Sequence, residues 1–98
     1  MTVDKMVEYL GEPYCASVID GERVVYRKLN EDFDFEVSGV RQGKMLYSLY
    51  VWRLRPHREI VGVYHNIHGA EVLKDFLGYC AIRYENRLSG IQAEREEL

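Results

Sequence analysis

Two histidines and a glutamate lie close together in the sequence, at His65, His68 and Glu71. Imidazole and carboxylate groups are ordinary ligands of zinc and other transition metals. The spacing matches no closed four-ligand pattern, and no further histidine or cysteine lies close by. We therefore interpret these residues as loop histidines near a helix start, and we predict neither a metal site nor another cofactor.

The chain has two cysteines, Cys15 and Cys80, which are too few for a disulfide scaffold. Both sit among apolar residues, where a thiol usually behaves as a small hydrophobic group, so we expect two reduced core thiols. Nothing in the sequence marks either thiol as exposed or electropositive, which a nucleophilic cysteine requires. Because no nucleophile elbow, phosphate loop, dinucleotide fingerprint or zinc-protease motif is present either, we predict a protein that is not an enzyme.

Basic and aromatic side chains gather at residues 50–58. Aromatic rings can stack on bases while guanidinium groups bind phosphates, so this segment could contact a nucleic acid. The candidate contact residues are Tyr50, Trp52, Arg53, Arg55 and Arg58.

Acidic side chains oppose this interpretation. The chain carries 16 acidic and 13 basic residues, a net charge of −3, so it has no overall attraction to phosphate. An acidic cluster predicted to lie alongside Arg53 consists of Glu31, Asp32, Asp34 and Glu36. We therefore keep a nucleic-acid-associated protein as the alternative function only. The same cluster could belong to a surface that mimics nucleic acid or docks on a basic protein, although such charges usually form only a solubilising face. The other acidic residues of that surface would be Asp20, Glu22, Glu94, Glu96 and Glu97.

The pattern of apolar residues predicts the elements that hold these side chains. Helical spacing, with Thr2 as a cap, predicts a short helix over 2–10. Asp20-Gly21 is a strong hairpin signal between strands at 14–19 and 22–29. Three more strands are predicted at 33–40, 44–55 and 58–65, and an amphipathic helix begins at about 69.

These elements define the predicted fold class. We predict an α+β fold with a short N-terminal helix, a five-stranded antiparallel β-meander and a C-terminal amphipathic helix packed on the sheet. Residues 1–98 are expected to form a single domain, with a frayed tail at about 91–98. The element order is superficially similar to that of double-stranded RNA-binding domains. Those domains have three strands and a basic start to the last helix, where this chain has Gly69, Ala70 and Glu71.

The turn residues predict how the third and fourth strands pair. With Gln42-Gly43 as a two-residue loop, Phe35 lies opposite Tyr50 and Phe33 opposite Trp52, which makes these four residues core. The other face then carries a second set of apolar and aromatic residues, whose exposure to water is unfavourable. The predicted interaction face consists of Tyr26, Tyr47, Leu49 and Val51.

Something must cover this predicted interaction face. Because one short and one longer helix cannot easily cover both sides of the sheet, we predict a homodimer, with a different protein as the other possible partner. No apolar run approaches the roughly 18 residues of a membrane span, so we expect no membrane contact and a cytoplasmic location. The predicted function is a small, non-enzymatic protein-interaction module. An accessory or inhibitory protein of a bacterium, phage or other mobile element would fit its size and charge.

Overall fold

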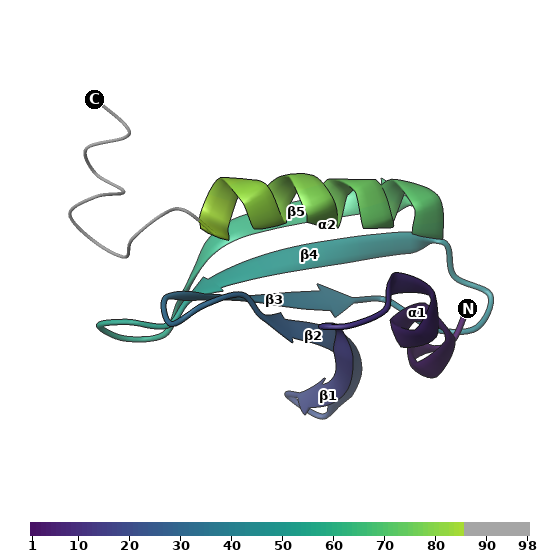
Figure 1. The fold of residues 1–98 in the computed structure, drawn as a ribbon. Coiled ribbons are helices and arrows are strands. Elements are labelled where there is room, and N and C mark those ends of the chain that lie inside the picture. Colours follow the sequence, from purple (N-terminus) through teal and green to yellow (C-terminus); the bar gives the residue numbers. More distant parts are fainter. Residues whose placement is uncertain (86–98) are drawn as a thin grey trace.

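The computed structural model of the chain describes residues 1–85 and shows an α+β fold (Figure 1). The tail predicted at about 91–98 therefore lies outside the described residues. The five strands form one antiparallel sheet in the order β1-β2-β3-β4-β5, which confirms the predicted meander. The elements are α1 (Val3–Leu10), β1 (Cys15–Ile19), β2 (Glu22–Lys28), β3 (Phe33–Ser38), β4 (Leu46–Arg53), β5 (Glu59–His68) and α2 (Ala70–Glu85).

Helix α1 begins and ends where its capping residues dictate. The Thr2 side chain accepts a hydrogen bond from the Lys5 backbone N–H at 3.2 Å, which satisfies one of the free donors of the first turn. At the other end, the Gly11 N–H donates to the Val7 carbonyl at 2.8 Å. The predicted N-terminal helix is thus confirmed, and its inward residue Met6 is fully buried.

The predicted Asp20-Gly21 hairpin turn is confirmed, and a second local turn follows it. Asp20 and Gly21 both have positive φ, the geometry of a tight hairpin turn, and they place Ile19 opposite Glu22. In the next turn, the Asn30 side chain accepts hydrogen bonds from the backbone N–H groups of Asp32 (2.8 Å) and Phe33 (3.0 Å). This local bonding determines where β2 ends and β3 begins.

The predicted pairing of β3 with β4 is wrong by one residue. Gln42-Gly43 does lie inside a turn, because the Lys44 N–H donates to the Arg41 carbonyl at 3.1 Å. However, β3 ends at Ser38 and β4 begins at Leu46, so the connection is longer than a two-residue loop. Phe35 consequently lies opposite Val51, not opposite Tyr50. Because side chains alternate between faces, this shift moves every β4 side chain to the face opposite the predicted one.

Strand β5 is an edge strand whose pairing with β4 is irregular. The register shifts once between Tyr47 and Leu49 and again between Val51 and Trp52, and in each interval β5 holds one residue more than β4. Asn66, inside the first interval, has a φ of 60°, a left-handed conformation that is unusual within a strand. These two β-bulges increase the local twist of β5.

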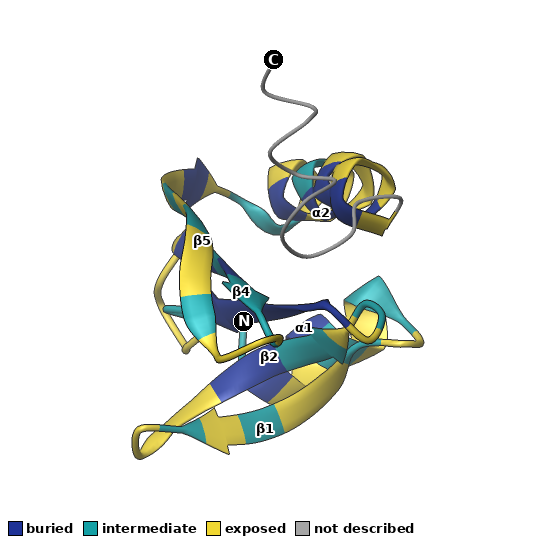
Figure 2. Cartoon of the chain, turned by 90° about the vertical axis from the view of Figure 1, so that its left-hand side faces the viewer, coloured by how far each residue is buried: buried dark blue, intermediate teal, exposed yellow. Residues whose placement is uncertain are grey.

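Both helices pack on the same face of the sheet. Helix α2 lies over β4 and β5, and α1 lies beside β1 and β2 (Figures 1 and 2). The Lys74 ammonium of α2 lies 5.1 Å from the ring centre of Tyr9 in α1, so the helices meet over the sheet. The shared core contains residues of both helices and of the helix-facing strand positions, namely Val3, Met6, Val25, Phe33, Phe35, Val37, Val40, Tyr47, Leu49, Val51, Ile67, Leu73, Leu77, Cys80, Ala81 and Tyr84.

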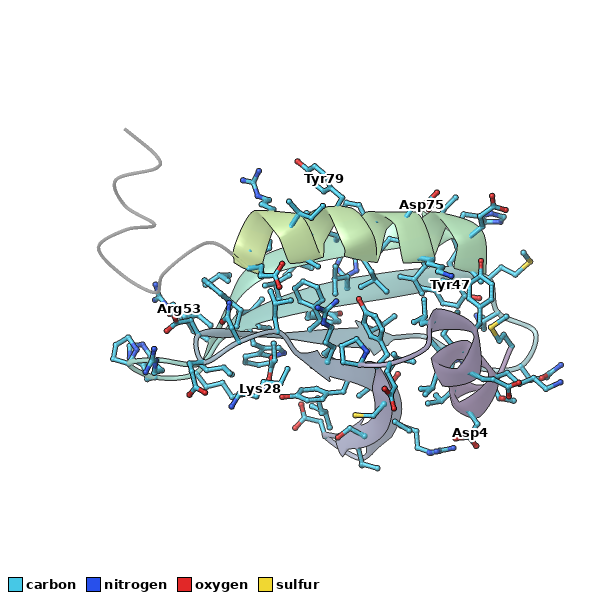
Figure 3. The ribbon with its side chains drawn as sticks, in the orientation of Figure 1. Asp4, Lys28, Tyr47, Arg53, Asp75 and Tyr79 are labelled. Carbon is cyan, nitrogen blue, oxygen red and sulfur yellow. The ribbon has the colours of Figure 1, made fainter. Side chains whose placement is uncertain are left out.

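Helix α2 buries one side and exposes the other. Tyr84 meets the rings of Phe33 and Phe35 edge-on, at centroid distances of 5.4 and 6.4 Å. Tyr79 points away from the sheet, whereas Tyr47 lies between α2 and the strands (Figure 3). Within residues 1–85, no helix is both long and apolar enough to span a bilayer.

Candidate functional site on the open face of the sheet

The sheet face opposite the two helices carries partly accessible aromatic and apolar side chains. We call this surface the open face, and its accessible large residues are Tyr26, Tyr50, Trp52, Ile60 and Val63. They follow from the register, because Tyr26, Glu36, Tyr50 and Val63 occupy one row across four strands. Ile60 and Val63 remain 44% and 46% exposed.

Two carboxylates lie buried beneath these side chains. Asp34 is 1% exposed and Glu36 is 9% exposed, although both belong to the face that the helices leave open. The Tyr26 hydroxyl donates to Asp34 Oδ2 at 2.8 Å, and the Trp52 Nε1–H donates to Glu36 Oε1 at 2.9 Å. The aromatic residues of β2 and β4 therefore shield the carboxylates from water and also hydrogen-bond to them.

Arg58 completes this network from the loop before β5. Its guanidinium donates to Asp34 Oδ2 at 3.0 Å and lies 4.3 Å from the ring centre of Trp52. A cation over an aromatic face is attracted by the ring quadrupole, so Arg58 is held by a carboxylate and a ring together. Asp34 Oδ1 is buried and has no hydrogen-bond partner among residues 1–85.

The environment of Tyr26 favours the protonated phenol. Burial, and next the hydrogen bond to the Asp34 carboxylate, raise the pKa of Tyr26 to about 12. The phenol therefore remains a hydrogen-bond donor at neutral pH.

The other two arginines predicted to contact nucleic acid also have acidic partners. Arg53 pairs with Glu59, its neighbour on β5, and lies on the helix-facing side opposite Phe33. Arg55 pairs with the buried Asp32 at 2.9 Å. Tyr50 and Trp52 lie together on the open face, so the structure separates the predicted aromatic residues from Arg53.

Three of the four residues predicted as an interaction face are buried inside the molecule. Tyr47, Leu49 and Val51 are 3%, 0% and 0% exposed, because the one-residue shift in register turns them toward α2. Tyr50 and Trp52, predicted as core, occupy the open face for the same reason. Only Tyr26 has the predicted position on the face opposite the helices.

A hollow of about 270 Å³ lies at one end of the open face. The Ile19–Glu22 end of the first hairpin forms one wall, and Glu36, Tyr50, Trp52 and Ile60 supply residues from three further strands. Its lining contains three carboxylates, Asp20, Glu22 and Glu36, and no basic side chain. The hollow thus combines apolar, aromatic and acidic groups.

The structure spreads the histidine cluster over β5 and α2 and places the two cysteines in different environments. His65 Nδ1 lies 2.8 Å from Ser48 Oγ, whereas Glu71 is in the first turn of α2. Among the residues that the structure describes, no three His, Cys, Asp or Glu side chains could hold a metal ion together. Cys80 is buried as predicted, but Cys15 is exposed on the edge strand β1, so the expectation of two core thiols is wrong for Cys15.

A second apolar surface lies on the outer side of α2. We call it the α2 stripe, and it consists of Val72, Tyr79 and Ile82, which are 55%, 58% and 71% exposed. A groove of about 670 Å³ adjoins the start of the stripe, where Val72 and Phe76 face β5. The periodicity of α2 indicated the buried side of the helix but did not single out this exposed set.

The sequence did not predict the hollow, because the wrong register placed Tyr50 and Trp52 on the face opposite Glu36. The available signal was Gly39 at the end of β3, since an isolated glycine in a strand pattern often marks an irregularity of the ladder. No protein-family model, curated protein or solved structure matches the chain.

Proposed function

We propose that this chain is a non-enzymatic, cytoplasmic protein-interaction module that binds a partner protein through the open face. The observation that carries the proposal is that α1 and α2 cover the same side of the sheet, which leaves Trp52, Ile60 and Val63 accessible. Full burial of an apolar side chain contributes about 1.5–3 kcal/mol, so a partner gains free energy by covering this face. Aromatic side chains are also enriched at the centres of protein interfaces.

The polar groups of the open face support a binding role over a catalytic one. Asp34 and Glu36 are both engaged by donors of the chain itself. A general base or nucleophile must instead reach a substrate atom. Asp34 therefore suits a structural role in holding Tyr26 and Arg58 in place, and Glu36 Oε1 holds the Trp52 indole in place.

The proposal is tested by capturing partners from native lysate on variants of the two apolar surfaces. Val63→Lys places a charge on the open face, and Val72→Lys places the same charge on the α2 stripe at similar exposure. We expect a partner that binds the wild type and Val72→Lys and that binds Val63→Lys at least about tenfold less, because burying an unpaired ammonium is costly. Thermal melts must show that both variants stay folded. Partners retained by Val63→Lys and lost by Val72→Lys would contradict the proposal.

We also propose a homodimer formed through the α2 stripe. An antiparallel pairing of two copies of α2 about a two-fold axis near Leu77 would bring Val72 of one copy to Ile82 of the other. The same pairing would place Glu71 beside Arg83, which have opposite charges and are both exposed. This pairing would thus bring exposed apolar residues together and match opposite charges.

Solution mass tests the homodimer directly. At micromolar concentration, light scattering should give twice the chain mass for the wild type and the mass of one chain for Ile82→Glu. A single-chain mass for the wild type would contradict the dimer and leave the open-face proposal intact.

Nucleic acid is not proposed as a partner, because Arg53, Arg55 and Arg58 each pair with a carboxylate of the chain.

A further inference from the structure

We propose that the hollow on the open face binds an arginine side chain of a basic segment in the partner protein. This inference rests on the proposed function, because it names the chemistry of the partner that the open face would bind. The observation that carries it is the combined lining of the hollow, in which three carboxylates stand beside Tyr50 and Trp52.

The charge of the hollow is not neutralised from within the described part of the chain. Residues 1–85 place no lysine or arginine within ion-pair distance of Asp20, Glu22 or Glu36, because the nearby arginines pair with other carboxylates. One oxygen of Glu22 accepts from the Gly39 N–H at 3.2 Å, and one oxygen of Glu36 accepts from Trp52. These hydrogen bonds orient the carboxylates without cancelling their charge, so a cation is the complementary group.

The size of the hollow suits a single long side chain. Pockets for drug-sized molecules and cofactors enclose about 300–1,000 Å³, and this hollow encloses about 270 Å³. It opens on the sheet surface between the first hairpin and β5, where a peptide backbone can remain outside while one side chain enters. Ile19 and Ile60 provide apolar contacts for the methylene groups of that side chain.

Arg58 shows how this face already recognises a guanidinium group. It is held by the Asp34 carboxylate and by the ring of Trp52, one row along the sheet from Glu36 and Tyr50. The hollow presents the same pair of groups, a carboxylate and an aromatic ring. Arginine fits this pair better than lysine, because its planar, weakly hydrated guanidinium can stack on a ring and bind a carboxylate at once.

The test uses the indole N–H signal of Trp52, which is unique because the chain contains one tryptophan. The full ¹⁵N-labelled chain is titrated with the acetylated peptide Arg-Gly-Arg-Gly-Arg, with its lysine counterpart and with its uncharged citrulline counterpart. We expect a saturable shift of the Trp52 signal with the arginine peptide, at least about threefold weaker affinity for the lysine peptide, and no saturation with citrulline.

Two matched variants locate the effect. Asp20→Asn removes one carboxylate from the hollow and keeps an Asn-Gly turn, which forms the same hairpin. It should weaken the arginine peptide about two- to fivefold, whereas Asp75→Asn on the outer side of α2 should leave the affinity unchanged. Equal effects of the two variants, equal affinity for the arginine and lysine peptides, or no saturable Trp52 shift would each overturn the inference.

These outcomes are separable from those that test the proposed function. If Val63→Lys loses a partner from lysate but the arginine peptide does not shift Trp52, the open-face proposal stands and the arginine inference fails. If the peptide binds but Val63→Lys loses no partner, the proposed function fails although the hollow binds arginine.

Discussion

The indole of Trp52 joins two kinds of interaction in one side chain, since its N–H bonds to Glu36 and its ring lies under Arg58. Trp52→Phe keeps an aromatic ring but leaves a buried carboxylate oxygen without its donor. We expect a loss of about 2–3 kcal/mol in the free energy of unfolding. Denaturant unfolding followed by circular dichroism measures it. Tyr50→Phe, on the same strand and face, is the control and should cost under about 0.5 kcal/mol. Equal stability of the two variants would contradict the role assigned to the Trp52 N–H.

The two thiols should differ sharply in reactivity. Cys15 is exposed, whereas Cys80 is fully buried and burial raises the pKa of its thiol to about 11. We expect an aromatic disulfide reagent to modify one thiol per folded chain and the second only in denaturant, because the thiolate is the reactive form. In Cys15→Ser the fast phase should disappear. Comparable rates for both thiols in the folded protein would contradict the burial of Cys80.

At the scale of the elements, two glycines are expected to respond in opposite directions to the same substitution. Gly21 has a φ of +79° in the first hairpin turn, so Gly21→Ala should destabilise the fold by about 1–2 kcal/mol. Gly78 lies inside α2 with open space around its Cα, so Gly78→Ala should stabilise the fold by about 0.5–1 kcal/mol. Thermal melts measure both. A stabilising Gly21→Ala would show that the turn does not require a positive φ.

The elements also show what the sequence could predict and why the rest could not be predicted. The first two turns were predictable because Asp20-Gly21 and Asn30 each determine their own backbone geometry locally. The third connection was not, because Gln42-Gly43 specifies a turn but not how many residues around it leave the ladder. Gly39 ends β3 with a positive φ, and Val40 then enters the core from outside the strand.

The residues of β4 could not correct this error by themselves. Both of its alternating sets are mainly apolar or aromatic, and each contains one polar residue, Ser48 in one set and Arg53 in the other. Period-two patterning therefore fits either face. The predicted site was wrong for this reason. Leu49 and Val51 were predicted on the interaction face and Tyr50 and Trp52 in the core, whereas the structure shows the reverse. Serine at position 48 was the single polar indication that the Tyr50 set faces away from the helices.

At the scale of the whole molecule, three tyrosine side chains and one cysteine side chain favour their protonated forms, mainly because of burial. Burial raises the pKa of Tyr14 and Tyr64, and it raises those of Tyr26 and Cys80 to about 12 and about 11. Each folded-state pKa lies above its unfolded value, so these groups contribute their full stability below about pH 9. That contribution is lost as pH rises through about 9–12.

We therefore expect the free energy of unfolding to fall steadily over this alkaline range. Denaturant unfolding at a series of pH values measures the slope. Tyr26→Phe should be less stable than the wild type at neutral pH, because the hydrogen bond to Asp34 is lost, and should lose less stability above about pH 10. Identical slopes for the two proteins would show that Tyr26 does not titrate with a raised pKa.

The two bulges of β5 limit how the molecule can assemble. A regular ten-residue edge strand would offer an evenly spaced row of backbone donors and acceptors, and identical chains could add to it without end. Asn66 and the second shift interrupt that spacing, so a docking strand would lose its match after a few residues. In the proposed homodimer, copies would instead associate through the side chains of α2, where a two-fold contact closes on itself. We expect the protein to remain dispersed at high concentration and not to form fibrils.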